Sequence, residues 1–441
     1  MPSLRHLAVL SLLPLTLGAA PAMPTGLWRA EGYGQLLAVT ADRSVLYHVA
    51  GPYCYPDPDT DGAQAILRQA MTMLGPDRIA FSDGPGQTRY VYRRIATLPA
   101  ACRTTRRWSG GDIARLVAAT FVDLYPRTPV RERHRRQLDA RLATVAADTV
   151  SADLFDRLAD ALDPLDDAHV SLSATIDGHE RSMESGEAPT LRAVRRDPAH
   201  GPDPAARERA WNDRYRIGIA GLLAGGGHLV AHRRILWGRI GRIGYLNVLT
   251  MGGFAEAGGD DLPVLDAALD AALADFRDLP GVIVDVSNNR GGYDGIGLRI
   301  AGRFAARAAG AYAKAPVGST VWQPFRVEPS PRIRYTGPVV LLTSDVTVSA
   351  GETFTLAMRA LPNVRHVGAR TRGALSDQLV KPLPNGWTLT LPAETYRAAD
   401  GRYYEGSGIP PADPVAPFLP NHATVLARLA AEMAAAGSPT S

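Results

Sequence analysis

The sequence predicts an α/β protein that also carries a helical subdomain and a small N-terminal β module. Three observations lead to this fold class. Short strand-like runs separated by turns fill residues 23–104, and apolar residues then recur at helical spacing. From about residue 228 onward, strand and helix signals alternate, which favours α/β architecture. The chain has 441 residues, of which 46% are apolar, so it is long enough for about two to four domains with real cores.

The chain begins with a predicted signal peptide, residues 1–22. Arg5 and His6 open it, an apolar run follows from Leu7 to Leu17, and small residues stand before the predicted cleavage point in Ala20-Pro21-Ala22. The apolar run is shorter than the ~20 residues that span a bilayer, although an uncleaved anchor is the alternative. We therefore expect an exported protein, periplasmic or extracellular, with no stable membrane insertion after signal cleavage.

The net charge and the cysteine content argue against several classes of function. The net charge of +4 is mild for this length, so no nucleic-acid partner is expected. The two cysteines, Cys54 and Cys102, both fall in the predicted β module. They could pair in an oxidising compartment, where closing such a loop stabilises a protein by about 4 kcal/mol, or stay as two buried free thiols. No Cys-x-x-Cys spacing occurs, so thiol chemistry and cysteine metal sites are not predicted.

The N-terminal half divides into two predicted parts. Residues 23–104 form the β-rich module, and residues 105–227 form the helical subdomain. The spacing of apolar residues predicts helices over about 112–124 and 151–162. Residues 177–215 are polar and charged and are predicted to form a lid-like excursion at the surface. The strands expected in the β module, each bounded by turn residues, are Gln35–Thr40, Ser44–Val49, Arg78–Phe81 and Thr88–Ile95.

Residues 228–425 form the predicted α/β core, and residues 426–441 form a C-terminal tail that begins as a helix. The expected strands of the core are 240–249, 282–286, 338–343, 364–367 and 387–391. The expected helices are 261–277, 293–308 and 349–361.

Two segments of the core have a structural and a functional interpretation. Asp285-Val-Ser-Asn-Asn-Arg-Gly291-Gly292 ends a strand in paired glycines, which form either a tight turn or a nest of N–H groups for an anion. Ser349-Ala-Gly-Glu352 opens a helix and matches a capping box. A nucleophile at the same place would gain the positive end of the helix dipole.

Two further segments carry single titratable groups. Asp167-Ala-His169 lies just after a predicted helix, where a histidine is either a surface residue or a base. Asp400 to Gly408 is a glycine-rich turn that contains Glu405. His228 and His232 are not favoured as metal ligands, because in a strand this spacing separates them by roughly 13 Å.

In their order along the chain, these segments resemble the C-terminal-processing, or tail-specific, serine peptidase family, which includes the tricorn core protease. The resemblance covers about residues 110–425 and includes Ile243-Gly-Tyr-Leu246 with Phe254, Thr371-x-Gly373 and Pro384-Asn-Gly386. It implies a crotonase-like or Clp-protease-like ββα catalytic core, a peptide or protein substrate, and no metal or organic cofactor. The short distance between the histidine segment and the next core strand leaves little room for a PDZ domain.

By position, the resemblance implies that Ser349 is the nucleophile. The N–H of Ala350 and that of Gly291 or Gly292 match the oxyanion hole. The processing branch of the family uses a lysine in a Thr-x-Gly-Lys motif as its base, but here Ala374 stands at that place, with Lys381 further along.

The tricorn-like branch uses a histidine base instead, and His169 matches it. Glu405 matches the glutamate of that branch, whereas Ala168 replaces the serine that links the two groups. A link between Glu405 and His169 would therefore be direct, through water, or through Ser171.

The sequence thus predicts an exported serine peptidase that works through an acyl-enzyme. The alternative is a non-catalytic protein of the same fold, which binds an apolar ligand or serves as a scaffold. The retinoid-binding proteins of the eye resemble this fold and are of that kind. The oligomeric state is not predicted.

Overall fold

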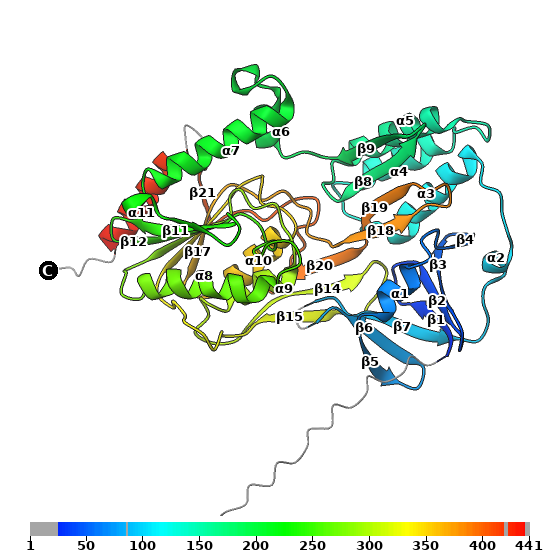
Figure 1. The fold of residues 1–441 in the computed structure, drawn as a ribbon, viewed down its shortest axis with the longest axis horizontal. Helices are drawn as coiled ribbons and strands as arrows, with labels where there is room; N and C mark the ends of the chain where they lie inside the picture. The colour runs from blue at the N-terminus through cyan, green and yellow to red at the C-terminus, as the bar shows by residue number, and fades with distance from the viewer. Residues whose placement is uncertain (1–24, 85–86, 419–421, 437–441) are drawn as a thin grey trace, which may run out of the picture.

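The computed structural model describes residues 25–84, 87–418 and 422–436. The predicted signal peptide therefore lies outside the described residues. In Figure 1 the β module and the helical subdomain lie at one end of the molecule, and the α/β core fills the other end. None of the helices in the described part is long and apolar enough to cross a bilayer.

The β module is one antiparallel sheet with the strand order β4-β3-β2-β1-β7-β6-β5. All four strands expected here are present, whereas β1, β4 and β5 were not expected. β4 has only four residues, and β5 is mostly exposed, so it lacks an apolar face that would give a periodic signal. Trp28, Leu37, Ile79 and Tyr92 are buried against the short helix α1 (Gly62–Leu67) and the sheet. The strands are β1 (Gly26–Ala30), β2 (Gln35–Val39), β3 (Ser44–Ala50), β4 (Tyr53–Pro56), β5 (Ala70–Gly75), β6 (Arg78–Ser82) and β7 (Tyr90–Ile95).

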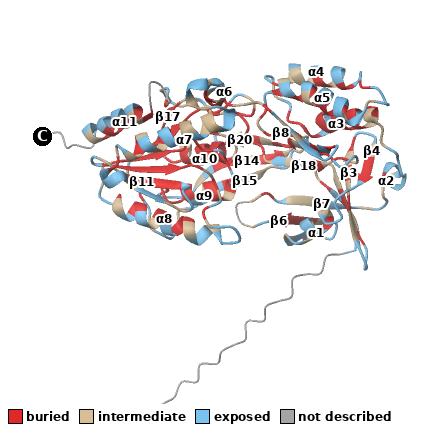
Figure 2. Cartoon of the chain, turned by 45° about the horizontal axis from the view of Figure 1, so that its top comes forward, coloured by how far each residue is buried: buried red, intermediate tan, exposed pale blue. Residues whose placement is uncertain are grey.

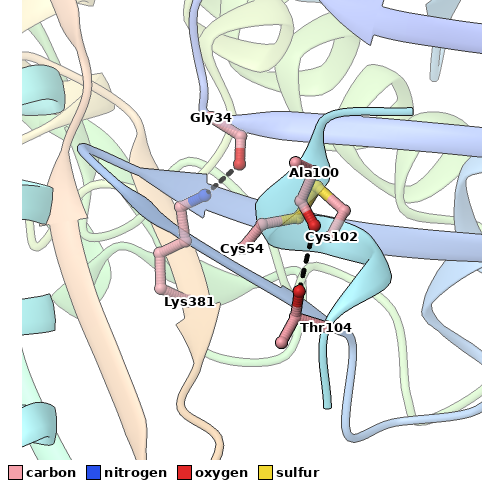
Figure 3. The surroundings of a disulfide bond; sticks show 6 residues. All are labelled: Gly34, Cys54, Ala100, Cys102, Thr104 and Lys381. Carbon is pink, nitrogen blue, oxygen red and sulfur yellow. Dashed lines mark hydrogen bonds between the residues drawn. A yellow bond between two sulfur atoms is a disulfide. The ribbon is translucent and has the colours of Figure 1, made fainter. Parts of the chain in front are cut away.

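A disulfide joins this sheet to the segment that leaves it. Cys54 lies on β4 and Cys102 on helix α2 (Ala100–Arg103), and their sulfur atoms are bonded with the Cα atoms 4.7 Å apart (Figure 3). The expected pairing is confirmed, and the alternative of two free thiols is not.

Removing this bridge should destabilise the protein without changing its fold. We expect the double variant Cys54→Ser, Cys102→Ser to lose about 4 kcal/mol of unfolding free energy, because the unfolded chain regains the entropy of the open loop. Urea unfolding followed by circular dichroism measures the loss. The reduced wild type should shift by a similar amount, and an unchanged midpoint in both samples would contradict a stabilising bridge.

The helical subdomain packs three helices over a four-stranded sheet. The helices are α3 (Gly110–Leu124), α4 (Glu132–Leu142) and α5 (Ser151–Leu162), and α4 was not expected. Ser109 and Asp112 form a capping box at the start of α3. The sheet has the order β18-β19-β8-β9, so it pairs β8 (Val170–Ile176) and β9 (His179–Ser185) with β18 (Gln378–Pro382) and β19 (Thr388–Pro392) from far along the chain. This pairing places the segment before β8 beside the core.

The core is a seven-stranded sheet with helices on both faces (Figures 1 and 2). Its order is β10-β11-β12-β13-β16-β17-β21, and every pairing from β12 to β21 is parallel. The strands are β10 (His228–Val230), β11 (Ile235–Ile240), β12 (Ile243–Val248), β13 (Val282–Asp285), β16 (Val339–Thr343), β17 (Val364–Gly368) and β21 (Asp413–Pro414). The expected alternation of strands and helices is confirmed, and with it the α/β class.

Successive residues of the central strands point into two different apolar layers. Leu341 packs with helices α8 (Asp261–Asp275), α9 (Asp294–Ala301) and α10 (Ala350–Arg359). Leu342 packs with α7 (Pro204–Ala220) and α11 (His422–Ala436). The predicted C-terminal tail therefore begins as a helix that covers the core.

Two smaller units complete the fold. A three-stranded sheet of β14 (Ala309–Pro316), β15 (Gln323–Val327) and β20 (Glu394–Ala398) has the order β15-β14-β20. The polar region 177–215 contains β9, α6 (Pro189–Arg196) and most of α7, so it is largely regular structure that links the subdomain to the core.

Candidate active site

Ser349 lies at a strained turn between strand β16 and helix α10. Its backbone has φ +59° and ψ −126°, a conformation that costs a residue with a side chain about 1–3 kcal/mol. Such strain persists where surrounding contacts over-determine it. The Ser349 N–H donates to Ala374 O at 3.0 Å and to Glu352 Oε2 at 3.3 Å. The latter contact is the glutamate half of the expected capping box.

Glu352 connects this turn to the loop that follows strand β17. Its buried carboxylate also accepts hydrogen bonds from Thr371 Oγ1 at 2.6 Å and from the N–H groups of Gly373 and Ala374, each at 2.8 Å. Burial raises the pKa of Glu352, while these donors oppose the shift. Glu352 thereby holds residues 371–374 against Ser349, which goes beyond the capping role that the sequence indicates.

The paired glycines after β13 approach Ser349 closely. A Cβ atom at Gly291 would lie 2.6 Å from Ser349 Cβ, and one at Gly292 would lie 2.3 Å from Met251 O, so both positions require glycine. The Gly291 N–H donates to Asn289 Oδ1 at 2.8 Å. Among the described residues, the N–H groups of Gly292 and Ala350 have no hydrogen-bond partner. Of the predicted oxyanion donors, these two are therefore available to a ligand.

His169 is buried at the entrance to strand β8. Its N–H donates to Asp167 Oδ1 at 3.0 Å, and its carbonyl accepts from Thr390 Oγ1 at 3.2 Å, so the backbone is fixed on both sides. Its side-chain Nδ1 is buried without a partner in the described structure. Burial lowers the pKa of His169, and the negative charges of Asp167 and Asp377 oppose that shift.

A cavity of about 310 Å³ is lined by three of the predicted site residues, whereas Gly291, Ala350 and Glu405 are not among its lining residues. Ser349, His169 and Gly292 all line it, although they come from three distant parts of the chain. Asp377 and Arg290 line it as well. The arrangement therefore places a hydroxyl, an imidazole, a free backbone N–H and a carboxylate around one space.

Glu405 does not make the contact with His169 that the resemblance implies. Its Oε2 accepts from the N–H groups of Leu375 and Ser376, each at 3.0 Å, and its Oε1 lies 2.9 Å from Arg131 Nη1. No hydrogen bond joins Glu405 to His169 in the described part of the chain. Ser171 does not link them either, because its hydroxyl bonds to Thr390 Oγ1 at 2.6 Å.

Arg131 instead joins Glu405 to the segment that carries His169. Its Nη1 lies 2.6 Å from Asp167 Oδ2, and its Nη2 donates to Gly373 O at 2.8 Å. Burial raises the pKa of Glu405 to about 7 against the positive charge of Arg131. Sequence reasoning missed Arg131, because it stands in an arginine-rich stretch where nothing sets it apart.

Asp377 is the carboxylate that shares the cavity with His169. Its Oδ2 accepts from Lys314 Nζ at 2.6 Å and from Thr88 Oγ1 at 2.9 Å. Despite its burial, the nearby ammonium group of Lys314 lowers the pKa of Asp377. Thr88 belongs to the N-terminal β module, so that module contacts the site directly. Sequence reasoning did not single out Asp377 or Lys314.

Lys381 lies away from the cavity. Its Nζ donates to Gly34 O of the β module at 2.7 Å (Figure 3). Burial lowers the pKa of Lys381 to about 7, which would suit a base. Its place, however, is against the β module and not among the residues that line the space beside Ser349.

We therefore expect Lys381→Met to keep kcat/KM for a peptide substrate within about threefold of the wild type, well under the ~10²-fold loss typical of a missing base. Initial rates at pH 7.5 measure this, and thermal unfolding checks that the variant is folded. A loss of activity in a folded variant would reinstate the lysine as a candidate base.

The two histidines that were not favoured as metal ligands have other contacts. His228 stacks on Trp237 with the ring centroids 4.1 Å apart, and His232 Nδ1 lies 3.1 Å from Ala255 O. Within the described ranges, no group of three or more His, Cys, Asp or Glu side chains could hold a metal ion.

Residues 242–415 match the model of peptidase family S41. This part of the chain belongs to peptidase family S41. The match includes the glycine pair, Ser349 and Glu405, whereas His169 precedes it. Membership of S41 makes the protein a serine peptidase by class, whose substrate is a peptide or protein, as the sequence predicts.

Solved structures share the fold of this chain. A candidate peptidase from Parabacteroides merdae ATCC 43184 is 22% identical with a TM-score of 0.58, and the match covers 73% of this chain and 96% of that one. Mature CPAF complexed with lactacystin is 12% identical with a TM-score of 0.52, over 74% and 99% of the two chains. These identities show the fold alone. No curated protein is similar enough in sequence to count as a relative.

Proposed function

We propose that this protein is an exported serine peptidase in which Ser349 is the nucleophile and His169 is the general base. The single observation that supports this most is the cavity of about 310 Å³, which the two residues share with Gly292 and Asp377. A nucleophile and a base around one cavity, with a backbone N–H donor beside them, are the arrangement that acyl transfer requires.

In this mechanism, Ser349 Oγ attacks the carbonyl carbon of the scissile peptide bond while its proton passes to the imidazole of His169. The N–H groups of Gly292 and Ala350 hold the resulting oxyanion, and each donor is worth about 3–4 kcal/mol in such sites. The tetrahedral intermediate collapses, the C–N bond breaks, and His169 returns the proton to the leaving amine. A water molecule then cleaves the acyl-enzyme by the same steps in reverse.

Asp377 supplies the carboxylate that this mechanism needs beside His169. It shares the catalytic cavity, and its negative charge favours the imidazolium that forms during attack. Lys314 and Thr88 hold Asp377 in place through its Oδ2 atom.

The role of Glu405 is indirect, because it acts through other residues. It binds the N–H groups of Leu375 and Ser376, directly before Asp377, and pairs with Arg131, which in turn holds Asp167. Its proposed role is therefore to position the loop that carries Asp377.

Export is supported by two features. Residues 1–22 have the pattern of a signal peptide, and the Cys54–Cys102 disulfide is of the kind that persists in oxidising compartments. The mass of the N-terminal fragment of the protein recovered outside the cytoplasm would show whether residues 1–22 are removed.

Incubation with a mixture of unmodified peptides, analysed by mass spectrometry, tests the proposed activity. New internal cleavage products in the wild type, absent with Ser349→Ala, are expected. An intact mixture with a folded wild type would favour the binding-protein alternative. The charged and polar groups that line the catalytic cavity favour a peptide over an apolar ligand.

A further inference from the structure

A second, larger cavity adjoins the catalytic one. Its volume is about 750 Å³, and it shares Ala168, Arg290 and Val348 with the space around Ser349 and His169. Val348 and Arg290 directly precede the nucleophile and the glycine pair in the sequence. A chain held at Ser349 therefore has this cavity beside it. Five arginines line the cavity: Arg192, Arg195, Arg196, Arg290 and Arg372.

The arginines that line this cavity outnumber the carboxylates that pair with them. Glu208 bridges Arg195 at 2.7 Å and Arg290 at 2.8 Å, and Glu187 also pairs with Arg195 at 2.8 Å. Arg192 has only distant acidic neighbours, at 3.8 Å. Arg196 forms no ion pair within the part of the chain that the structure describes, so its guanidinium is available to a ligand.

Arg372 is the most buried of the five, and only part of its guanidinium has a partner. Its side chain is only 11% exposed, and its Nη2 binds Asp166 Oδ1 at 2.7 Å and Asp166 O at 3.0 Å. Its Nε is buried without a partner in the described structure. The Arg372 N–H donates to Thr347 O at 2.9 Å, which ties this residue to the turn that holds Ser349. An unpaired N–H of a buried guanidinium is costly until an acceptor binds it.

The other acidic residues that line the cavity do not neutralise its excess of positive charge. Asp345 is engaged by Thr190, whose N–H and hydroxyl each donate to it at 2.7 Å. Asp163 and Glu184 also border a separate cavity at the surface of the helical subdomain. Arg290 lines the catalytic cavity as well, and the backbone of Arg372 is bonded to the turn that holds Ser349, so these two arginines connect the larger cavity to the catalytic one.

From this arrangement we propose that the arginine-lined cavity is a substrate subsite that binds a carboxylate of the peptide, with Arg372 and Arg196 as its main ligands. Guanidinium groups bind carboxylates through paired N–H donors, which gives both affinity and geometry. The carboxylate is carried either by an acidic side chain near the scissile bond or by the end of the peptide chain. This inference rests on the proposed peptidase function, because it assigns a specificity to the same site.

The test compares matched peptides that differ by one charge. Internally quenched peptides carry Glu or Gln at each of the three positions on either side of the cleaved bond, with the C-terminus free or amidated. We expect kcat/KM to favour Glu over Gln at one position, or the free end over the amide, by at least about tenfold in the wild type. Arg372→Gln and Arg196→Gln should each reduce that ratio. Arg428→Gln, which changes an exposed arginine on α11, is the matched control and should leave the ratio unchanged.

A binding measurement separates this inference from the proposed activity. Fluorescence anisotropy with the Ser349→Ala variant compares the same Glu and Gln peptides without turnover, so it tests the subsite even if no peptide is cleaved. Tighter binding of the carboxylate peptide, weakened by Arg372→Gln and by added salt, supports the subsite. Equal affinities, or a preference that survives both arginine variants, would overturn it. Loss of hydrolysis in the wild type with this preference intact would count against the peptidase proposal only.

Discussion

Replacing Ser349 with alanine is expected to lower kcat/KM for peptide hydrolysis by at least about 10⁴-fold, because the group that forms the acyl-enzyme is removed. The protein should stay folded. Alanine has a Cβ as serine does, so the strain of the turn at φ +59° is the same in both. Glu352 continues to bind the backbone N–H at position 349, since that contact does not involve the side chain.

Initial-rate kinetics with a quenched peptide measure the loss. Urea unfolding should show that the free energy of unfolding changes by no more than about 1 kcal/mol. Ser319→Ala is the matched control, because the Ser319 hydroxyl accepts a hydrogen bond from the exposed Val321 N–H at 3.1 Å and Ser319 is not among the residues that line the catalytic cavity. If Ser349→Ala retained most of the activity, another group would have to be the nucleophile.

Loss of the base should have the next largest effect. His169→Ala is expected to lower kcat/KM by about 10²–10⁴-fold, the range typical of a general base. In the wild type, the imidazole must be neutral to accept the serine proton, so the rate rises as pH increases through the pKa of His169 and then levels off. Because burial lowers that pKa, the midpoint of the rise should lie below about pH 6.5.

Asp377→Asn separates the two candidate carboxylates. Removing a negative charge beside His169 favours the neutral imidazole, so the rise should move to still lower pH while the plateau rate falls. Glu405→Gln should leave the midpoint in place, because Glu405 binds the loop and Arg131 instead of the ring. Profiles of kcat/KM against pH for the two variants measure this. A shift caused by Glu405→Gln and not by Asp377→Asn would reverse the assignment.

The sequence predicted the parts of the fold that depend on local pattern. The alternation of strands and helices after residue 228 indicated the α/β architecture, and the Ser-x-x-Glu pattern placed Ser349 at the start of a helix, where the structure has it. β4 has too few residues for a periodic signal, and β5 is mostly exposed and lacks an apolar face. The pairing of β8 with β19 could not be inferred, because nothing local specifies which distant strand completes a sheet.

The same limit applies to the candidate site. Ser349, His169 and Gly292 could be named from motifs, and they line one cavity. The carboxylate could not be named, because Asp377 is held by Lys314 of β14 and by Thr88 of the loop before β7, which lie far apart in the sequence. Glu405 lies in a recognisable motif, yet Arg131 and two backbone N–H groups occupy its oxygens. Whether a carboxylate faces a base depends on such tertiary partners.

Covalent labelling of the nucleophile tests in one experiment whether Ser349 and His169 act as a catalytic pair. The wild type, recovered with its disulfide intact, is treated with a fluorophosphonate at pH 7.5, digested and analysed by mass spectrometry. We expect one adduct, on the peptide that contains Ser349, with labelling slowed strongly by His169→Ala. Failure of the folded wild type to react, or an adduct on a different serine, would contradict this expectation.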